Sequence, residues 1–272
     1  MKTRSTYNPR TIIWEERCNL KEYDRKQRVM LVGSASPFIG GIESYIDDLL
    51  ASELNDQFLL GQLDPLEIKK RFHEQKSHLS LRELNVAFRV LRTFIKAIRK
   101  FNPDLVHIHT SSYWGFYEKT FLLIIAKKFF KKKVVLHIHG GEFDLFYHKS
   151  LCKRLIDRTI QYADKTLIVS KKIKETIGDT YMTVVDNSTH FNDKALTIDK
   201  GSLRDKYGIP KEKTVFLSIA ILEKRKRVYE TVEVFRDVLA CRNDCVFIIA
   251  GQGPEKERIL RFVNRHGLNN NV

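Results

Sequence analysis

Two histidine pairs with identical spacing are the residues of this chain best suited to ligand binding or catalysis. His107 and His109 end one apolar run, in the segment PDLVHIHT, and His137 and His139 end another, in VVLHIHGGEF. If both runs are β-strands, alternation places the two histidines of a pair on one face of their strand. The carboxyl ends of strands in an open α/β sheet form the crevice where ligands bind. The pairs therefore predict polar groups at a ligand-binding edge.

Two roles are open to these histidines. Four imidazoles can converge on a zinc ion if the two strands are neighbours and in register, although no carboxylate ligand is evident besides Glu142. The alternative, which we favour, makes His107 and His137 hydrogen-bonded core residues, because they lie deeper in their strands. His139 then lies at the strand tip and contacts a ligand. On this interpretation the chain holds no metal.

A glycine pair marks another candidate loop. Gly40 and Gly41 precede Ile42, where the chain passes from a loop into a helical pattern. Backbone without a Cβ can approach a ligand closely, and a helix N-terminus offers free N–H groups with partial positive charge. This suits a phosphate or a sugar hydroxyl, whereas the simpler alternative is a glycine turn. The loop lacks the G-x-G-x-x-G spacing, which argues against a dehydrogenase.

The elements that must position these residues follow a β–α rhythm from Arg28 onward. Short Val/Ile/Leu runs, typical of parallel strands buried on both faces, alternate with segments of helical period. The predicted strands are 29–33, 58–63, 105–109, 134–139, 166–169, 183–185, 215–219 and 246–250. Two apolar stripes are expected to face the core, one made of Ile42, Tyr45, Ile46, Leu49, Leu50 and Leu54, the other of Leu84, Phe88, Leu91, Ile95 and Ile98.

This rhythm predicts an α/β fold with parallel sheets in two domains. Residues 1–27 are a polar lead-in, 28–190 form a complete Rossmann-like N-terminal domain, and 191–272 form the beginning of a second, incomplete one.

Composition limits the class of protein and favours an anionic partner. The 272 residues carry 48 Lys and Arg against 33 Asp and Glu, a formal net charge of +15. The sequence has no apolar run long enough to cross a bilayer and no secretion signal at its start. We therefore expect a cytoplasmic protein, either free or peripheral on the inner face of the cell membrane, with a polyanionic partner.

The segment from Lys119 to Lys133 has six lysines and no acid. Its phenylalanines and leucines must partly face the sheet, so a solvated basic helix end is one interpretation. Docking of Lys127–Lys133 on an anionic membrane is the other, and we favour it. A nucleic-acid partner is not expected, because the chain has no recognisable nucleic-acid-binding motif.

The order of these motifs resembles the retaining glycosyltransferases of family 4. The GGIE loop, PDLVHIHT, VVLHIHGGEF, ADKTLIVS and VVDN look like that family's acceptor-side domain. FLSIAILEKRKRVYETVEVF and FIIAGQGPEKERI are similar to the start of its donor domain. The resemblance implies the two-domain GT-B fold, a nucleoside-diphosphate-sugar donor, a glycan or lipid-linked acceptor, and no cofactor.

Site residues follow from the resemblance position by position. His139 matches the histidine that contacts the transferred sugar, and is the expected catalytic residue. The donor is expected to contact Gly41, Lys226, Gly251 and Gly253. The acceptor is expected to contact Gly40, Ser111, Gly140, Gly141 and Glu142.

The chain also departs from the family pattern. Ala220-Ile221 replaces a Gly-Arg pair, and Arg227 follows Lys226 where the family has glycine. The family's two glutamates would lie beyond Val272, so we expect the chain as given to lack transferase activity. A non-catalytic sugar-nucleotide-binding or scaffold protein is the alternative.

Overall fold

The computed structural model describes residues 26–34, 40–65, 68, 81–178, 181–186 and 199–272. The chain divides into two compact units, Met1–His190 and Phe191–Val272, which we call unit 1 and unit 2. Among the helices of the described residues, none has the length and apolar character needed to span a membrane.

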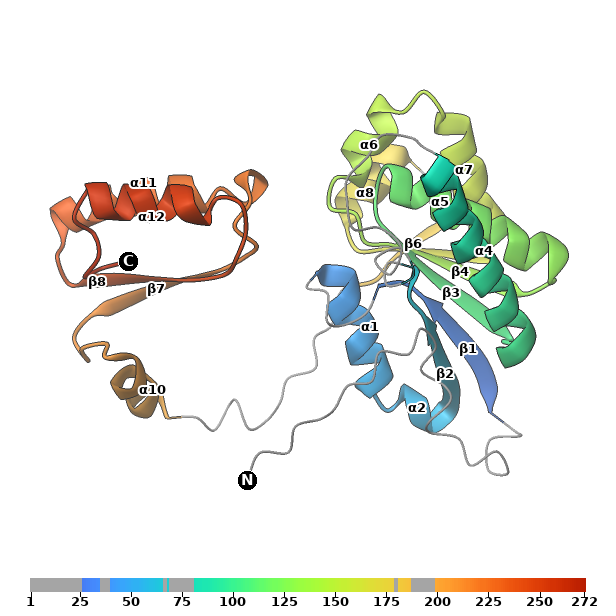
Figure 1. Cartoon of the computed structure of the whole chain (residues 1–272), viewed down its shortest axis with the longest axis horizontal. Helices are drawn as coiled ribbons and strands as arrows, with labels where there is room; N and C mark the ends of the chain where they lie inside the picture. The colour runs from blue at the N-terminus through green and yellow to red at the C-terminus, as the bar shows by residue number, and fades with distance from the viewer. Residues whose placement is uncertain (1–25, 35–39, 66–67, 69–80, 179–180, 187–198) are drawn as a thin grey trace. The chain divides into compact units, whose positions relative to one another are not determined.

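Unit 1 is built on a six-stranded parallel sheet with strand order β2-β1-β3-β4-β5-β6 (Figure 1). The strands are β1 (Gln27–Val32), β2 (Phe58–Leu63), β3 (Leu105–Thr110), β4 (Lys133–Ile138), β5 (Lys165–Ile168) and β6 (Met182–Val184). The predicted α/β class is confirmed, and each predicted strand of unit 1 is found with its ends displaced by two residues at most. The strand order reverses between β1 and β3, and such switch points are where open α/β sheets bind ligands.

Helices cover both faces of this sheet. They are α1 (Gly41–Ala51), α2 (Leu54–Gln57), α4 (Leu81–Phe101), α5 (Trp114–Ile124), α6 (Phe143–Lys149), α7 (Lys153–Tyr162) and α8 (Lys171–Ile177), with a π-helical turn η2 (Ile125–Phe129) after α5. Figure 1 shows α1 on one side of the sheet and α4 and α5 on the other. Strand β1 accordingly sends Leu31 to pack with Ile46 of α1, and Met30 to the larger core that contains Phe94 of α4.

The predicted stripe of α4 is wrong at Phe88, which is 62% exposed. The buried face of the helix consists of Val86, Val90, Phe94, Ala97, Ile98 and Phe101. These residues also recur at three- and four-residue spacing, so the helix is rotated relative to the prediction. The first stripe is interrupted as well, because α1 ends at Ala51 and Leu54 begins the separate turn α2.

Unit 2 contains a pair of parallel strands, β7 (Thr214–Ile219) and β8 (Cys245–Ala250). Its helices are α10 (Lys200–Tyr207), α11 (Val228–Cys241) and α12 (Lys256–Arg265), with a 3₁₀ turn η3 (Lys224–Lys226) before α11. Val232 and Phe235 of α11 and Ile259 of α12 form one core with Phe247 of β8, and both helices lie on the same face of the strands (Figure 1). Both predicted strands of this unit are confirmed.

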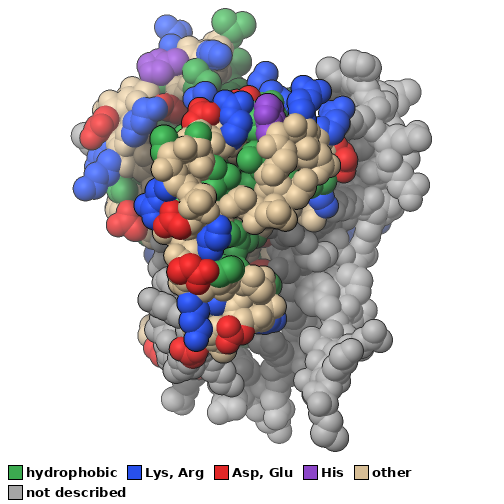
Figure 2. All heavy atoms as spheres, turned by 90° about the vertical axis from the view of Figure 1, so that its left-hand side faces the viewer, with side chains coloured by type: hydrophobic (Ala, Val, Ile, Leu, Met, Phe, Trp, Pro, Cys, Tyr) green, Lys and Arg blue, Asp and Glu red, His purple; other side chains and the backbone are tan. Residues whose placement is uncertain are grey.

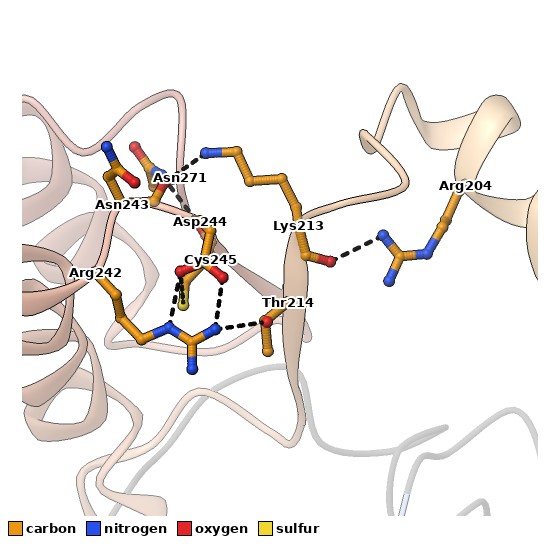
Figure 3. Close-up of polar contacts among 8 residues, drawn as sticks. All are labelled: Arg204, Lys213, Thr214, Arg242, Asn243, Asp244, Cys245 and Asn271. Atoms are coloured by element: carbon orange, nitrogen blue, oxygen red, sulfur yellow. Dashed lines mark hydrogen bonds and ion pairs between the residues drawn. The ribbon is translucent and has the colours of Figure 1, made fainter.

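Polar contacts join the amino ends of β7 and β8 (Figure 3). The Arg242 guanidinium binds both carboxylate oxygens of Asp244, at 2.8 and 2.5 Å, and donates to Thr214 Oγ1 at 3.1 Å. Lys213 Nζ donates to the Asn243 carbonyl at 2.6 Å. These contacts align the two strands at the end opposite to their carboxyl-end loops.

Candidate functional site

The strand register of unit 1 brings the two histidine pairs together. His107 and His109 lie on β3, His137 lies on the neighbouring β4, and His109 is the register partner of His137. His139 follows β4, and its backbone N–H donates to the Thr110 carbonyl at 2.9 Å. The ring centroid of His109 lies 5.4 Å from that of His137 and 5.2 Å from that of His139. We call these four residues the histidine cluster.

Tyr45 of α1 covers the histidine cluster. Its ring centroid lies 5.0 Å from those of His137 and His139 and 5.7 Å from that of His109. Burial raises the pKa of the Tyr45 hydroxyl, so this side chain stays neutral. The sequence interpretation assigned Tyr45 only to a core stripe. The missed signal was its place one turn after the Gly-Gly pair, at the helix end nearest the site.

The prediction that His107 and His137 are hydrogen-bonded core residues is wrong about the hydrogen bonds. His137 is fully buried, but neither of its ring nitrogens has a hydrogen-bond partner among the described residues. Within the same part of the chain, Nε2 of His107, Nε2 of His109 and Nδ1 of His139 are also buried without a partner. A buried polar group left unpaired typically costs about 1–3 kcal/mol, so the cluster is not explained by fold stability.

One hydrogen bond links the deeper part of the cluster to its tip. His109 Nδ1 and His139 Nε2 are 3.0 Å apart, so one of these nitrogens carries a proton and donates the hydrogen bond, and the other accepts it. This contact fixes the orientation of the half-buried His139 ring. His109 itself is 1% exposed, so it supports His139 from within the domain.

Burial keeps the whole cluster uncharged near neutral pH. Desolvation lowers the pKa of His137 to about 2, that of His107 to about 3 and that of His139 to about 4. The pKa of His109 is also lowered, first by desolvation and then by repulsion from the other three imidazoles. The cluster therefore presents neutral imidazoles, which can donate or accept hydrogen bonds and can bind metals.

Two glycines allow the elements around the cluster to come close. A Cβ on Gly33, at the end of β1, would lie 3.1 Å from the Cβ of His109 and 2.5 Å from Cδ1 of Ile46. A Cβ on Gly140 would lie 3.1 Å from the backbone nitrogen of Ser112. Larger residues at either position would push α1 or the β3 loop outward. Gly33 and Ser112 were not singled out from the sequence, since only the fold makes them neighbours of the site.

The predicted acceptor residues form the edge of this site. Ser111 follows β3, and Gly140, Gly141 and Glu142 follow His139 and lead into α6. Ser111, Gly141 and Glu142 are exposed. Gly40 precedes α1 and Gly41 begins it, and a Cβ on Gly41 would meet no atom within 4 Å. Thus the predicted residues of unit 1 gather on loops at the carboxyl ends of its strands, beside open space at Gly41.

The predicted donor residues of unit 2 lie on the loops after β7 and β8. Leu222 N–H donates to the Gln252 carbonyl at 2.9 Å, which joins the two loops. Gly251 and Gly253 each leave no room for a Cβ beside the backbone of the β7 loop. Lys226 ends η3, is exposed, and its ammonium makes no hydrogen bond or ion pair within the described chain. These loops therefore offer backbone groups and an available cation.

The replacements near Lys226 have structural consequences. Arg227 adopts φ 55° and ψ 29°, the left-handed conformation that glycine prefers. Arg225 binds Glu223 at 2.6 Å, whereas Arg227 Nε lies 4.0 Å from Glu230. Ile221, which replaces the family arginine, is 42% exposed. Arg225 is thus held by a neighbouring carboxylate, which makes it less available to take the place of that arginine.

Relatives in sequence support the family of both units. Residues 39–187, more than half of the chain, match Glycosyltransferase Family 4, and residues 199–272 match Glycosyl transferases group 1. The α-monoglucosyldiacylglycerol synthase of Acholeplasma laidlawii is 23% identical over 74% of this chain and 57% of its own length. An uncharacterised glycosyltransferase of Methanocaldococcus jannaschii is 24% identical over 92% of the chain and 64% of its own length. The chain thus spans less than two thirds of these relatives.

Solved structures support the fold. Sucrose-phosphate synthase from Thermosynechococcus elongatus superposes with a TM-score of 0.65 at 10% identity, over 91% of this chain and 69% of that one. Starch synthase IV from Arabidopsis thaliana, solved with ADP and acarbose, gives 0.60 at 10% identity, over 90% and 72%. The family match covers most of unit 1, including the strands that carry the histidine cluster. The chain therefore belongs to glycosyltransferase family 4 and has the fold of the two-domain GT-B proteins.

Proposed function

We propose that the protein transfers a sugar from a nucleoside-diphosphate donor to a glycan or lipid-linked acceptor, with retention at the anomeric carbon. The observation that carries the proposal is His139, a neutral imidazole held by His109 at the carboxyl edge of the family 4 unit. An uncharged donor and acceptor of hydrogen bonds suits a sugar hydroxyl. The name of the A. laidlawii relative, a glucosyldiacylglycerol synthase, favours a glycolipid or glycan product.

The donor would bind through unit 2. Lys226 supplies a positive charge for the diphosphate, as a point-charge ammonium can do. Gly251 and Gly253 pack closely against the backbone of the β7 loop, and we propose that the loop they shape lines the nucleotide. In unit 1, Gly40 and Gly41 present the N-terminus of α1, whose partial positive charge suits a phosphate or hydroxyl. We propose that Lys226 neutralises charge on the donor diphosphate without a metal at that position.

The test is sugar transfer by the whole protein. Purified protein is incubated with UDP-, ADP- and GDP-sugars and a lipid or glycan acceptor, and release of the nucleoside diphosphate and product formation are measured. We expect transfer from one donor class, with a donor KM that rises in a Lys226→Met variant. Donor binding without transfer to any acceptor would instead favour a sugar-nucleotide-binding or scaffold protein. The replacement of the family arginine by Ile221 permits this alternative.

We also propose that unit 1 docks on an anionic membrane through part of its lysine-rich segment. Lys127 binds Asp164 at 2.9 Å, Lys119 binds Glu118 at 2.9 Å, and Lys132 donates to Asn102 at 2.7 Å. The remaining lysines of the segment, Lys128, Lys131 and Lys133, are exposed, as is Phe129 at 67%.

On the surface shown in Figure 2, by contrast, Lys and Arg side chains lie among Asp and Glu side chains. Three lysines with no acidic partner among the described residues, beside an exposed aromatic ring, can attract anionic headgroups and insert at the interface.

Vesicle co-sedimentation tests this docking. The Lys128→Gln/Lys131→Gln/Lys133→Gln variant should bind vesicles of anionic phospholipid more weakly than the natural chain, and binding should fall with added salt. The matched control replaces Lys96, Lys206 and Lys211, which are also exposed. Equal losses in both variants would mean that net charge, and not this surface, causes binding.

A further inference from the structure

The histidine cluster contains more unpaired nitrogen atoms than the proposed sugar transfer uses. His139 is assigned to the substrate and His109 Nδ1 holds it, but Nε2 of His109 and the rings of His107 and His137 have no role in that proposal. We propose that these three imidazoles bind a divalent transition-metal ion such as Zn²⁺, and that the ion fixes the orientation of His139. This goes beyond the proposed function, because the ion would lie inside unit 1 and not at the donor diphosphate.

The backbone supplies the convergence that such a site requires. Neighbouring parallel strands carry the three residues, with His109 and His137 in direct register. Each can offer one ring nitrogen so that all three atoms lie within 4.8 Å of one another. Zinc–nitrogen bonds of about 2.0–2.1 Å place ligand nitrogens about 3.4 Å apart in a tetrahedral site. Side-chain rotations that move the rings by about an ångström would therefore close the site around an ion.

The chemistry of the ligands selects the kind of ion. Each of the three groups is an imidazole, and no carboxylate or thiol of the described residues joins them in this set. Imidazole nitrogen suits zinc, copper, nickel and iron, whereas calcium and magnesium prefer oxygen ligands. His109 and His137 are 1% and 0% exposed, and each keeps a ring nitrogen with no partner in the part of the chain that the structure describes. An ion at this position would give partners to buried nitrogens that otherwise lack them.

The hydrogen bond to His139 has the form expected around a bound metal. Metal-binding histidines commonly donate their second ring N–H to an acceptor that orients them. In His109 the unpaired nitrogen is Nε2, and Nδ1 lies 3.0 Å from His139 Nε2. With Nε2 on the metal, Nδ1–H would donate to His139 Nε2. His139 would then carry its proton on Nδ1, so His109 acts as a positioning residue that fixes the tautomer and orientation of the His139 ring.

Metal binding is measured directly on tag-free protein after dialysis against a chelator. We expect the chain to take up one equivalent of Co²⁺ with visible absorption bands, and stoichiometric Zn²⁺ to bleach them. Zn²⁺ should also raise the Tm, because it binds the folded state. His107→Leu and His137→Leu should each weaken binding at least tenfold and remove the Tm increase. The matched control is His148→Leu, an exposed histidine of α6, which should bind like the natural chain.

Three results would overturn the proposal. They are no stoichiometric uptake by the natural chain, uptake that persists in both leucine variants, and uptake that is lost when the histidines outside the cluster are replaced. If the leucine variants do not fold, ¹⁵N-histidine NMR of the natural chain decides, since Zn²⁺ must shift ring signals of the cluster. Loss of metal binding with intact sugar transfer would leave the proposed function standing, so the two ideas fail separately.

Discussion

The two units place different chemistry at the same position of similar folds. At the carboxyl ends of the strands of unit 1 lie buried, neutral imidazoles, a serine and glycine backbone. At the corresponding ends in unit 2 lie exposed cations, from Lys224 to Arg227, on a short 3₁₀ turn. Neutral hydrogen-bonding groups suit sugar hydroxyls and cations suit a diphosphate, so loops at equivalent strand ends of one architecture can carry different recognition chemistry.

Acid should destabilise unit 1 more than any single substitution, because its cluster is neutral when folded. The folded pKa values of His137, His107 and His139 lie at about 2, 3 and 4, below the usual value of 6.5. The unfolded chain therefore binds more protons below pH 6.5, and stability is lost as the pH falls from there toward the folded pKa values. Each such histidine can remove about 1.4 kcal/mol per pH unit.

The measurement is the free energy of unfolding of chelator-treated protein between pH 7.5 and 4.5, followed by denaturant titration. The His137→Leu variant, which lacks one of the titrating groups, should show a shallower slope. The same slope in both proteins would mean that the cluster is hydrated or already protonated in the folded state.

Removal of the tip imidazole should affect catalysis more than stability. In the whole protein, His139→Ala should lower kcat/KM by one to a few powers of ten, which corresponds to about 1.5–4 kcal/mol of transition-state stabilisation. Its ring is half-buried, so Tm should change little. His148→Ala, on the neighbouring α6, is the control. A large fall in Tm with unchanged specific activity would assign His139 to folding.

The cation of unit 2 should act on donor binding. Lys226→Met should raise the KM for the donor by about ten- to a hundredfold, because one charge-assisted contact to a phosphate is typically worth about 1.5–3 kcal/mol. Lys224→Met, in the same 3₁₀ turn, is the matched control. Equal effects of the two substitutions would mean that the turn contributes only diffuse positive charge.

The smallest expected effect concerns backbone strain beside Lys226. Arg227→Gly should stabilise unit 2 by about 0.5–1 kcal/mol, since glycine adopts the φ of 55° found here without steric cost. Lys224→Gly, where φ is not positive, should destabilise it instead. Thermal unfolding of both variants provides the measurement, and destabilisation by Arg227→Gly would show that the Arg227 side chain matters more than its backbone.

The strands were predictable and the site only partly so. All eight strands follow from local apolar runs, and His139 could be identified as a strand-tip residue from the sequence. The burial of Phe94 in place of Phe88 could not be predicted, since two overlapping stripes fit the helical period of α4 equally well. The pairing of His109 with His137 depends on β3 and β4 being neighbours, and Tyr45 enters the site only because α1 covers them. Such contacts depend on strand order, which local sequence does not encode.

Histidine ¹⁵N NMR across a pH titration tests the contrast between the units most directly. The ring nitrogens report the protonation of each imidazole, with free imidazole in the same buffer as the reference. We predict that the signals of His107, His109, His137 and His139 keep neutral-imidazole shifts down to about pH 5, because desolvation disfavours the charged form. Protonation of His139 at pH 6.5 or above would contradict the account, because the tip of unit 1 would then carry a cation as unit 2 does.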